Sequence, residues 1–103
     1  LFMVASEQAE TVGLAWGNHR EDGSTWLPFL GVKPAYRRRG VGRSLLSRFI
    51  EESRRRGSGK VSLDTDPRLV PAVRLYESMG VVVEGTAENP YGLQLVVYHL
   101  DIT

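Results

Sequence analysis

The sequence predicts an α/β (α+β) domain in which helices pack on one mixed sheet, and three observations support that prediction. Segments of strand composition and two amphipathic helical segments follow one another as three strands, a helix, a strand, a helix and two strands. Each helical segment has a single apolar stripe, which has to be buried against another layer. The chain has 103 residues, of which 42% are hydrophobic and 24% charged, as expected for one small globular domain.

The expected strands are short apolar or alternating segments separated by turn residues. They cover residues 1–5, 11–18, 25–32, 60–65, 81–84 and 93–100, with a turn over residues 86–92. Pro28 and Gly31 interrupt the third strand. Because proline cannot donate to a ladder and glycine often marks a bulge, we expect that strand to be distorted.

The two expected helices are defined by apolar residues at helical spacing. The first covers residues 40–56, and its stripe is Val41, Leu45, Phe49 and Ser53, with Leu46 and Ile50 beside it. The second begins near Pro71 and stops at Gly80, with an apolar face of Ala72, Val73, Tyr76 and Met79. Both are followed by glycine, which readily takes the left-handed conformation found at helix ends.

Composition excludes several kinds of chemistry. The absence of cysteine excludes a thiolate nucleophile, a thiolate zinc site and a disulfide framework. With only two histidines, we expect no metal site. The sequence contains neither an apolar run of the ~20 residues that cross a bilayer nor a secretion signal, so we expect no membrane contact and a cytoplasmic location. Since the chain starts without methionine, we also expect that an upstream segment is missing from it.

Positive charge is concentrated although the net charge is only +1. Arginines at 37, 38, 39 and 43 form one cluster and those at 54–56 a second. In a nearly neutral chain, a local concentration of positive charge such as the first cluster indicates a local anionic ligand, and we do not expect a nucleic-acid partner. The second cluster is interpreted as a solvated helix surface.

The first cluster surrounds a glycine-containing turn at residues 37–44, between a strand and a helix. Gly40 and Gly42 allow positive φ and close approach of a ligand, so that successive amides and a helix N-terminus can point at a phosphate group. A Walker-type loop is excluded because no Gly-Lys-Ser/Thr follows. A dinucleotide fingerprint matches Gly40, Gly42 and Asp64, but its third glycine is Leu45 here, so this alternative ranks lower.

Residues 32–46 (VKPAYRRRGVGRSLL) resemble the signature of the GNAT superfamily of N-acetyltransferases, whose pattern Arg/Gln-x-x-Gly-x-Gly/Ala is matched by Arg37, Gly40 and Gly42. Residues 72–80 (AVRLYESMG) resemble the later helix of that family, and the resemblance covers residues 11–100. It implies a mixed, mostly antiparallel central sheet that lacks the first strand and the first two helices of the family. Those elements normally wall the acceptor pocket.

The resemblance also implies a site that takes acetyl-CoA as cosubstrate, without a metal. The distorted strand would offer backbone amides to the pantetheine arm, and amides of residues 38–43 would hold the pyrophosphate. On this basis we expect the cofactor-binding residues to be Leu30, Gly31, Val32, Arg37, Arg38, Arg39, Gly40, Val41, Gly42, Arg43 and Ser44. Two departures are Leu69, where the family often has asparagine, and Val81, where it usually has an aromatic residue.

The function expected from these residues is acetyl transfer to a primary amine by direct attack, because no cysteine is present for a covalent relay. The resemblance further implies that Tyr76 is the general acid for the departing thiolate, and that an amide near Leu30 of the distorted strand stabilises the oxyanion. The base is left open among Glu21, Asp22, Asp64 and Glu84. His19 and His99 are interpreted as structural, and Trp16 and Trp26 line the acceptor pocket or fill core.

Two other functions stay open at this point. One is a catalytically degenerate domain of the same fold that binds CoA or a partner protein, which Leu69 and the missing N-terminal elements favour. The other is nucleic-acid binding through the arginines, which ranks last. The acceptor is a small molecule or a peptide amine. An exposed sheet edge at residues 1–5 or 93–100 would favour a homodimer.

Overall fold

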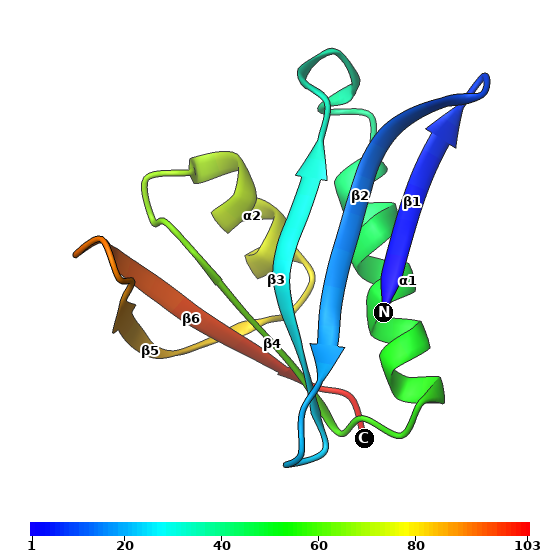
Figure 1. The fold of residues 1–103 in the computed structure, drawn as a ribbon. Helices are drawn as coiled ribbons and strands as arrows, with labels where there is room; N and C mark the ends of the chain where they lie inside the picture. The colour runs from blue at the N-terminus through cyan, green and yellow to red at the C-terminus, as the bar shows by residue number, and fades with distance from the viewer.

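The computed structural model describes residues 1–103 and contains one six-stranded sheet, two α-helices and a short 3-10 helix (Figure 1). The strands are β1 (Phe2–Glu7), β2 (Glu10–His19), β3 (Ser24–Val32), β4 (Lys60–Thr65), β5 (Val82–Glu88) and β6 (Gln94–Asp101). The helices are η1 (Pro34–Tyr36), α1 (Val41–Arg55) and α2 (Val70–Ser78). The element order agrees with the sequence prediction. Neither α-helix has the length and apolar character that crossing a bilayer requires.

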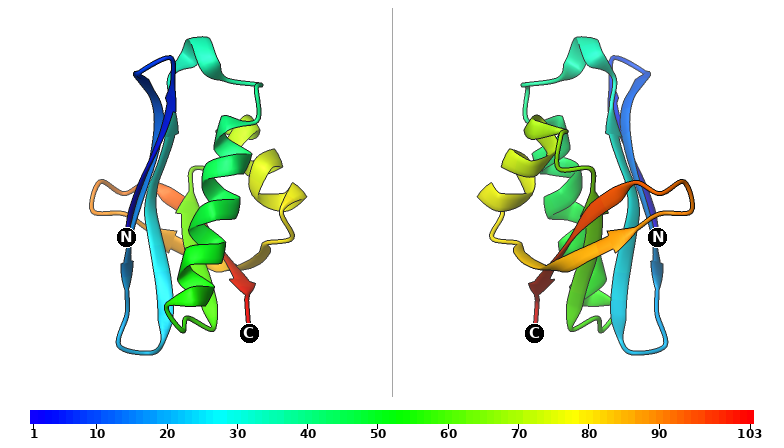
Figure 2. Two further views of the ribbon diagram at one scale, coloured as in Figure 1. Left: turned by 90° about the vertical axis from the view of Figure 1, so that its right-hand side faces the viewer. Right: turned by 90° about the vertical axis from the view of Figure 1, so that its left-hand side faces the viewer.

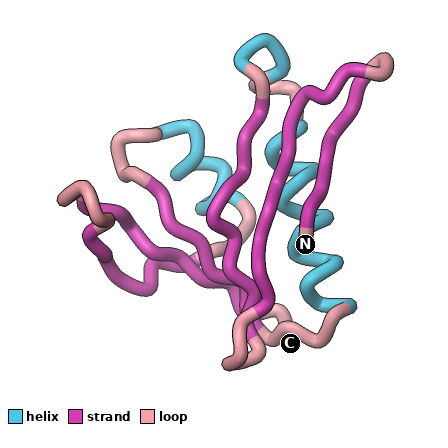
Figure 3. Tube along the Cα trace, in the orientation of Figure 1, coloured by secondary structure: helices cyan, strands magenta, loops and turns pink.

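The sheet consists of two halves that separate from each other. Its strand order is β1-β2-β3-β4-β6-β5, and only β3 and β4 pair in parallel. That parallel pairing covers Ser24–Leu27 and Lys60–Leu63 and then stops. Beyond it β3 stays with β2 and β4 stays with β6, so the halves splay into a V (Figures 1 and 3). The mixed, mostly antiparallel sheet is confirmed.

A bulge in β3 marks the point where the halves separate. Leu27 and Pro28 of β3 together oppose the single residue Gly17 of β2. Leu27 is also the last residue of β3 that pairs with β4. Since Pro28 has no N–H to give to a ladder, continued pairing on both sides of β3 is disfavoured there. The expected distortion of this strand is confirmed at Pro28, whereas the register is regular at Gly31.

Both helices lie on the same side of the sheet and share one hydrophobic core (Figure 2). The helical periodicity identified the inner face of α1 correctly, because its buried residues are Leu45, Leu46, Phe49, Ile50 and Ser53. In α2 only Tyr76 is buried, with Ala72, Leu75 and Met79 partly buried against the core. Leu75 takes the place in this face that the sequence analysis gave to Val73. A short helix with one buried side chain is held weakly by packing alone.

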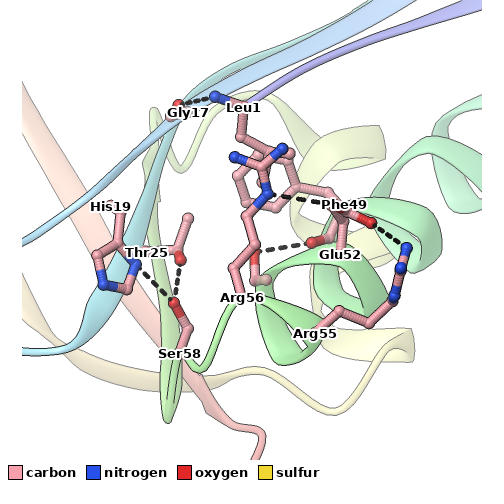
Figure 4. Close-up of polar contacts among 10 residues, drawn as sticks. Leu1, Gly17, His19, Thr25, Phe49, Glu52, Arg55, Arg56 and Ser58 are labelled. Carbon is pink, nitrogen blue, oxygen red and sulfur yellow. Dashed lines mark hydrogen bonds and ion pairs between the residues drawn. The ribbon is translucent and has the colours of Figure 1, made fainter.

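The end of α1 that lies far from the glycine turn is rich in polar contacts (Figure 4). Arg55 and Arg56 both pair with Glu52, at 3.0 and 3.2 Å. Nδ1 of His19 lies 3.1 Å from the hydroxyl of Ser58, which also contacts the Thr25 hydroxyl. The second arginine cluster therefore belongs to the surface of a helix end, and His19 joins β2 to the segment after α1.

Two details of the sheet differ from the sequence prediction. Residues 86–88, which were assigned to a turn, belong to β5. The expectation that residues 93–100 could form an exposed edge is wrong, because β6 lies between β4 and β5. The edge strands are β1 and β5. A strand order that departs from chain order depends on long-range pairing, which local composition does not encode.

Candidate active site

The turn that leads into α1 has the backbone geometry of an anion-binding site. φ is +65° at Arg38 and +80° at Gly40, which is the N-cap residue of α1 and provides no side-chain cap. Within the chain, the N–H groups of residues 38–43 have no hydrogen-bond acceptor; Ser44 donates the first helical bond, to the Gly40 carbonyl oxygen at 2.9 Å. Successive free amides at a helix N-terminus favour a negatively charged group.

The free side of β3 provides a second set of backbone groups. The Lys33 N–H donates to the Val12 carbonyl oxygen on β2 at 2.8 Å. In an antiparallel ladder the backbone N–H and C=O groups of successive residues point alternately to the two sides of a strand, so Gly31, like Lys33, directs its groups toward β2. Leu30 and Val32 are out of phase with Lys33 and turn theirs toward the gap where β4 has separated. In agreement, the carbonyl oxygen of Val32 accepts a bond from Nε of Arg37 at 3.2 Å. The Leu30 N–H is therefore open to a ligand, whereas that of Gly31 is directed at β2.

One pocket of about 730 Å³ joins the glycine turn, the open side of β3 and the start of α2. Of the residues expected to bind the cofactor, it is lined by Leu30, Gly31, Val32, Arg37, Arg38, Gly40, Val41, Gly42 and Arg43. The pocket also includes Tyr76, the expected general acid. Segments around residues 31, 40 and 76 are thus brought together by the fold, which the sequence could only suggest by resemblance.

The arginines of the turn have different environments. Arg37 and Arg38 line the pocket, and Arg38 makes no ion pair. Arg39 does not line it; its guanidinium lies 3.8 Å from Glu7 and 5.2 Å from the ring centre of Tyr36. Nη2 of Arg43 donates to the Ser78 hydroxyl at 2.7 Å. Positive charge beside the free amides therefore comes mainly from positions 37 and 38.

Ser44 lies outside this pocket, on a shallow depression against β1, and its amide is already bonded within α1. Several lining residues were not named as site residues by the sequence analysis. They are Tyr36, Leu69, Pro71, Ala72 and Leu75. Tyr36, Ala72 and Leu75 do occur inside the two motifs, so the motifs themselves carried the signal.

Tyr76 lines the pocket with a buried phenol group, which can act as a proton donor there. Its side chain is 7% exposed, and its ring centre lies 6.2 Å from that of Tyr98. Burial, and then the charge of Asp64, raise the pKa of the Tyr76 phenol above its usual value. The phenol therefore stays protonated at neutral pH and can donate a proton.

Among the acidic residues left open as a base, Asp64 is the one whose charge raises the pKa of Tyr76. It follows Leu63, the last residue of β4 that pairs with β3, so it lies where the sheet opens. Burial raises the pKa of its carboxyl group. Asp22 instead accepts bonds from Ser24, and Glu84 pairs with Lys60 at 3.3 Å. None of the four carboxylates, Asp64 included, lines the pocket itself, so Asp64 is distinguished only by its place at the opening of the sheet and by its charge beside Tyr76.

The remaining candidates lie away from the pocket. Nδ1 of His99 is buried without a hydrogen bond and lies 3.6 Å from Glu84. Trp26 is covered by the guanidinium of Arg20, and Trp16 is 45% exposed. Histidine and carboxylate side chains nowhere form a group of three that could hold a metal ion.

Comparison with known proteins agrees with this geometry. A model of the acetyltransferase (GNAT) family matches residues 1–81. The chain belongs to the GNAT family. This GNAT chain is 39% identical over 59 residues to L-methionine sulfoximine/L-methionine sulfone acetyltransferase of Salmonella typhimurium, a match that covers 57% of the chain and 33% of that enzyme. It spans about a third of the length of the curated relatives that it matches.

Solved structures share the fold of this GNAT chain. The ribosomal-protein-S18-alanine N-acetyltransferase of Escherichia coli superposes with a TM-score of 0.88 at 25% identity, covering 100% of this chain and 69% of that one. The structure of yncA from Salmonella typhimurium with its cofactor acetyl-CoA gives a TM-score of 0.86 at 25% identity, over 99% and 64% of the two chains.

Proposed function

We propose that this GNAT chain transfers an acetyl group from acetyl-CoA to a primary amine. The observation that carries the proposal is the single pocket in which the unpaired amides of the glycine turn, the open backbone of β3 and Tyr76 meet. A related structure was solved with acetyl-CoA, which supports the choice of cosubstrate.

The chain's own residues suit both ends of that cosubstrate. Free amides of residues 38–43, with Arg37 and Arg38 beside them, fit a diphosphate, and each charge-assisted bond contributes about 1.5–3 kcal/mol. Leu30 and Val32 can bond the amide groups of an extended pantetheine arm as a neighbouring strand would. Eight of the 15 lining residues are hydrophobic, which suits the apolar parts of the arm.

Acetyl transfer in this site needs no covalent intermediate on the protein. The amine nitrogen forms a bond to the acetyl carbon, and the bond from that carbon to the CoA sulfur breaks. The N–H of Leu30 donates to the oxyanion, and one such donor contributes about 3–4 kcal/mol. Tyr76 lines the pocket and gives its proton to the leaving thiolate, since a tyrosine phenol is protonated at neutral pH and burial keeps it so.

We assign the base to Asp64, which receives the proton of the amine through water. Its charge is felt by Tyr76, and its carboxyl group lies where β3 and β4 separate. Burial raises the pKa of this carboxyl group, which makes the carboxylate a better proton acceptor than an exposed one.

The test is release of free CoA from acetyl-CoA with a panel of small amines and peptides. The panel contains both classes because the relatives are named for a small molecule and for a ribosomal protein. Tyr76→Phe is expected to lower kcat by about 10²–10⁴-fold with little change in CoA affinity. Tyr98→Phe is the matched control, because Tyr98 is equally buried but lies outside the pocket, and it should keep kcat. Full turnover by the Tyr76 variant would remove the acid from the mechanism.

The second candidate function is a CoA-binding domain of this fold without catalysis. It is favoured by Leu69, which stands at the pocket where the family often has asparagine and is 55% exposed. This alternative predicts CoA affinity without turnover across the whole panel. A cytoplasmic location and a homodimer stay predictions; the edge strand β1 is the surface on which we would place a dimer contact, and gel filtration tests it.

A further inference from the structure

The helix that carries Tyr76 has few attachments to the rest of the protein. Within α2 only Tyr76 is buried, and no side chain caps the N-terminus of the helix at Leu69. The side-chain hydrogen bonds that join this helix and its C-cap residue to another element all come from Arg43, in the first turn of α1. The position of Tyr76 in the pocket therefore depends on a polar contact as well as on packing.

The contact between Arg43 and α2 is well defined. Nη2 of Arg43 donates to the Ser78 hydroxyl at 2.7 Å, and Nη1 donates to the sulfur of Met79 at 3.4 Å. The Ser78 hydroxyl gives its own proton to the Leu75 carbonyl oxygen at 2.7 Å. Because a hydroxyl has one proton, its oxygen must accept from Arg43, which fixes the direction of both bonds.

Arg43 thus has two separate roles available to it. Its N–H is one of the unpaired amides of the glycine turn, whereas its guanidinium is directed at the last turn of α2. Arg38, by contrast, lines the pocket without an ion pair in the chain. In the sequence Arg38 and Arg43 both read as phosphate-binding arginines of the glycine turn, whereas in the structure only the Arg43 side chain is bonded to α2.

We propose that the Arg43 side chain is a positioning residue, which fixes α2, and with it Tyr76, relative to the phosphate-binding turn. It does not bind phosphate with its guanidinium. The catalytic consequence rests on the proposed function, since it requires Tyr76 to act as the acid. The structural consequence, a firmer attachment of α2, does not depend on catalysis.

The experiment compares Arg43→Met and Ser78→Ala, alone and together, with Arg48→Met. Arg48 is an exposed arginine of α1 that lies outside the Tyr76 pocket, so its variant removes the same charge. Misplacement of a catalytic group by ~1 Å costs up to ~100-fold, and we expect about a tenfold fall in kcat for Arg43→Met and for Ser78→Ala. CoA affinity should stay within about twofold of the value for Arg48→Met. The double variant should be no slower than Arg43→Met, because both changes break one contact.

Hydrogen exchange of the unliganded protein gives a readout without catalysis. The backbone N–H groups of residues 73–78 should exchange faster in both single variants, and at the wild-type rate in Arg48→Met. If Arg43→Met instead weakens CoA binding tenfold or more while Ser78→Ala leaves kcat and exchange unchanged, the guanidinium is a phosphate ligand and the proposal is wrong. If wild-type protein binds CoA but never turns over, the proposed function fails, and the exchange rates alone decide the role of Arg43.

Discussion

Replacement of Gly40 by alanine tests most directly whether the turn that enters α1 binds phosphate, as proposed. Gly40 has φ of +80°, and a Cβ atom added there would meet no atom within 4 Å. The cost of the substitution is therefore backbone strain alone, which is about 1–2 kcal/mol for an L-residue in the left-handed region. No side-chain cap holds this N-cap residue, so we expect alanine to relax to negative φ in the unliganded protein.

Relaxation has a calculable effect on cofactor affinity. The amides that follow Gly40 turn away from the phosphate position, and the ligand has to restore the left-handed geometry when it binds. A penalty of about 1–2 kcal/mol corresponds to a roughly 5- to 30-fold higher Kd for CoA. Isothermal titration calorimetry of Gly40→Ala against wild-type protein measures this change.

Gly23→Ala is the matched control, because Gly23 also has positive φ, +84°, with no atom within 4 Å of an added Cβ. Its turn is held by bonds from the Ser24 N–H and hydroxyl to Asp22, so the strain stays in the folded protein. We expect its melting temperature to fall by about 4–16 °C, with wild-type CoA affinity. Wild-type affinity in Gly40→Ala, or an equal loss of affinity in both variants, would refute the reasoning.

Three further predictions follow from packing and charge. Gly42→Ala is expected to keep CoA affinity within about threefold of the wild-type value. The Leu75 methyl group, 3.2 Å from the added Cβ, can shift, and alanine is the better helix former by about 1 kcal/mol. A larger loss of affinity in calorimetry would contradict this prediction. Gly17→Ala should destabilise the fold by about 1–3 kcal/mol or more, since the added Cβ would overlap the ring of Phe49, and an unchanged melting curve would be the contrary result. Asp64→Asn should raise the melting temperature at pH 7 while lowering kcat by about 10²–10⁴-fold. Burial raises the pKa of Asp64, so protonation of this group stabilises the folded state fully below about pH 4, and the stabilisation is lost as pH rises through the raised pKa. The gain in melting temperature of Asp64→Asn over wild-type protein should therefore shrink as pH falls toward about 4. A lower melting temperature of Asp64→Asn at pH 7 would contradict the assignment of the shift.

Local patterns in the sequence were sufficient to locate most elements. The helical stripe of α1 and the glycine after each helix reflect the period and termination of one segment, so both could be recognised without the fold. Pro28 indicated a distorted strand because a missing N–H affects any ladder in which it is placed. The extent of β5 was underestimated, since residues 86–88 have turn composition but pair with β6.

The candidate site could be predicted only in part. Motif resemblance predicts residues 30–32 and 37–44 at the cofactor and Tyr76 as the acid, and the pocket includes all of them except Arg39 and Ser44. The preference for Asp64 as a base came from the structure, because four carboxylates were equivalent in the sequence. The alternation that turns Leu30 toward the gap and Gly31 toward β2 depends on the register between β2 and β3.

By itself, the sequence determined the place of the turn that enters α1 and the positive φ of Gly40, because the φ of glycine, the free amides of a helix N-terminus and the period of an apolar stripe are properties of adjacent residues. The second residue of this turn with positive φ is Arg38 and not Gly42, which the sequence did not predict. Only the tertiary structure decided which arginine meets which partner. Arg39 reaches Glu7 on β1, and Arg43 reaches Ser78, 35 residues further along the chain. Such contacts depend on strand order and helix packing, which bring distant segments together and are not encoded in any one segment.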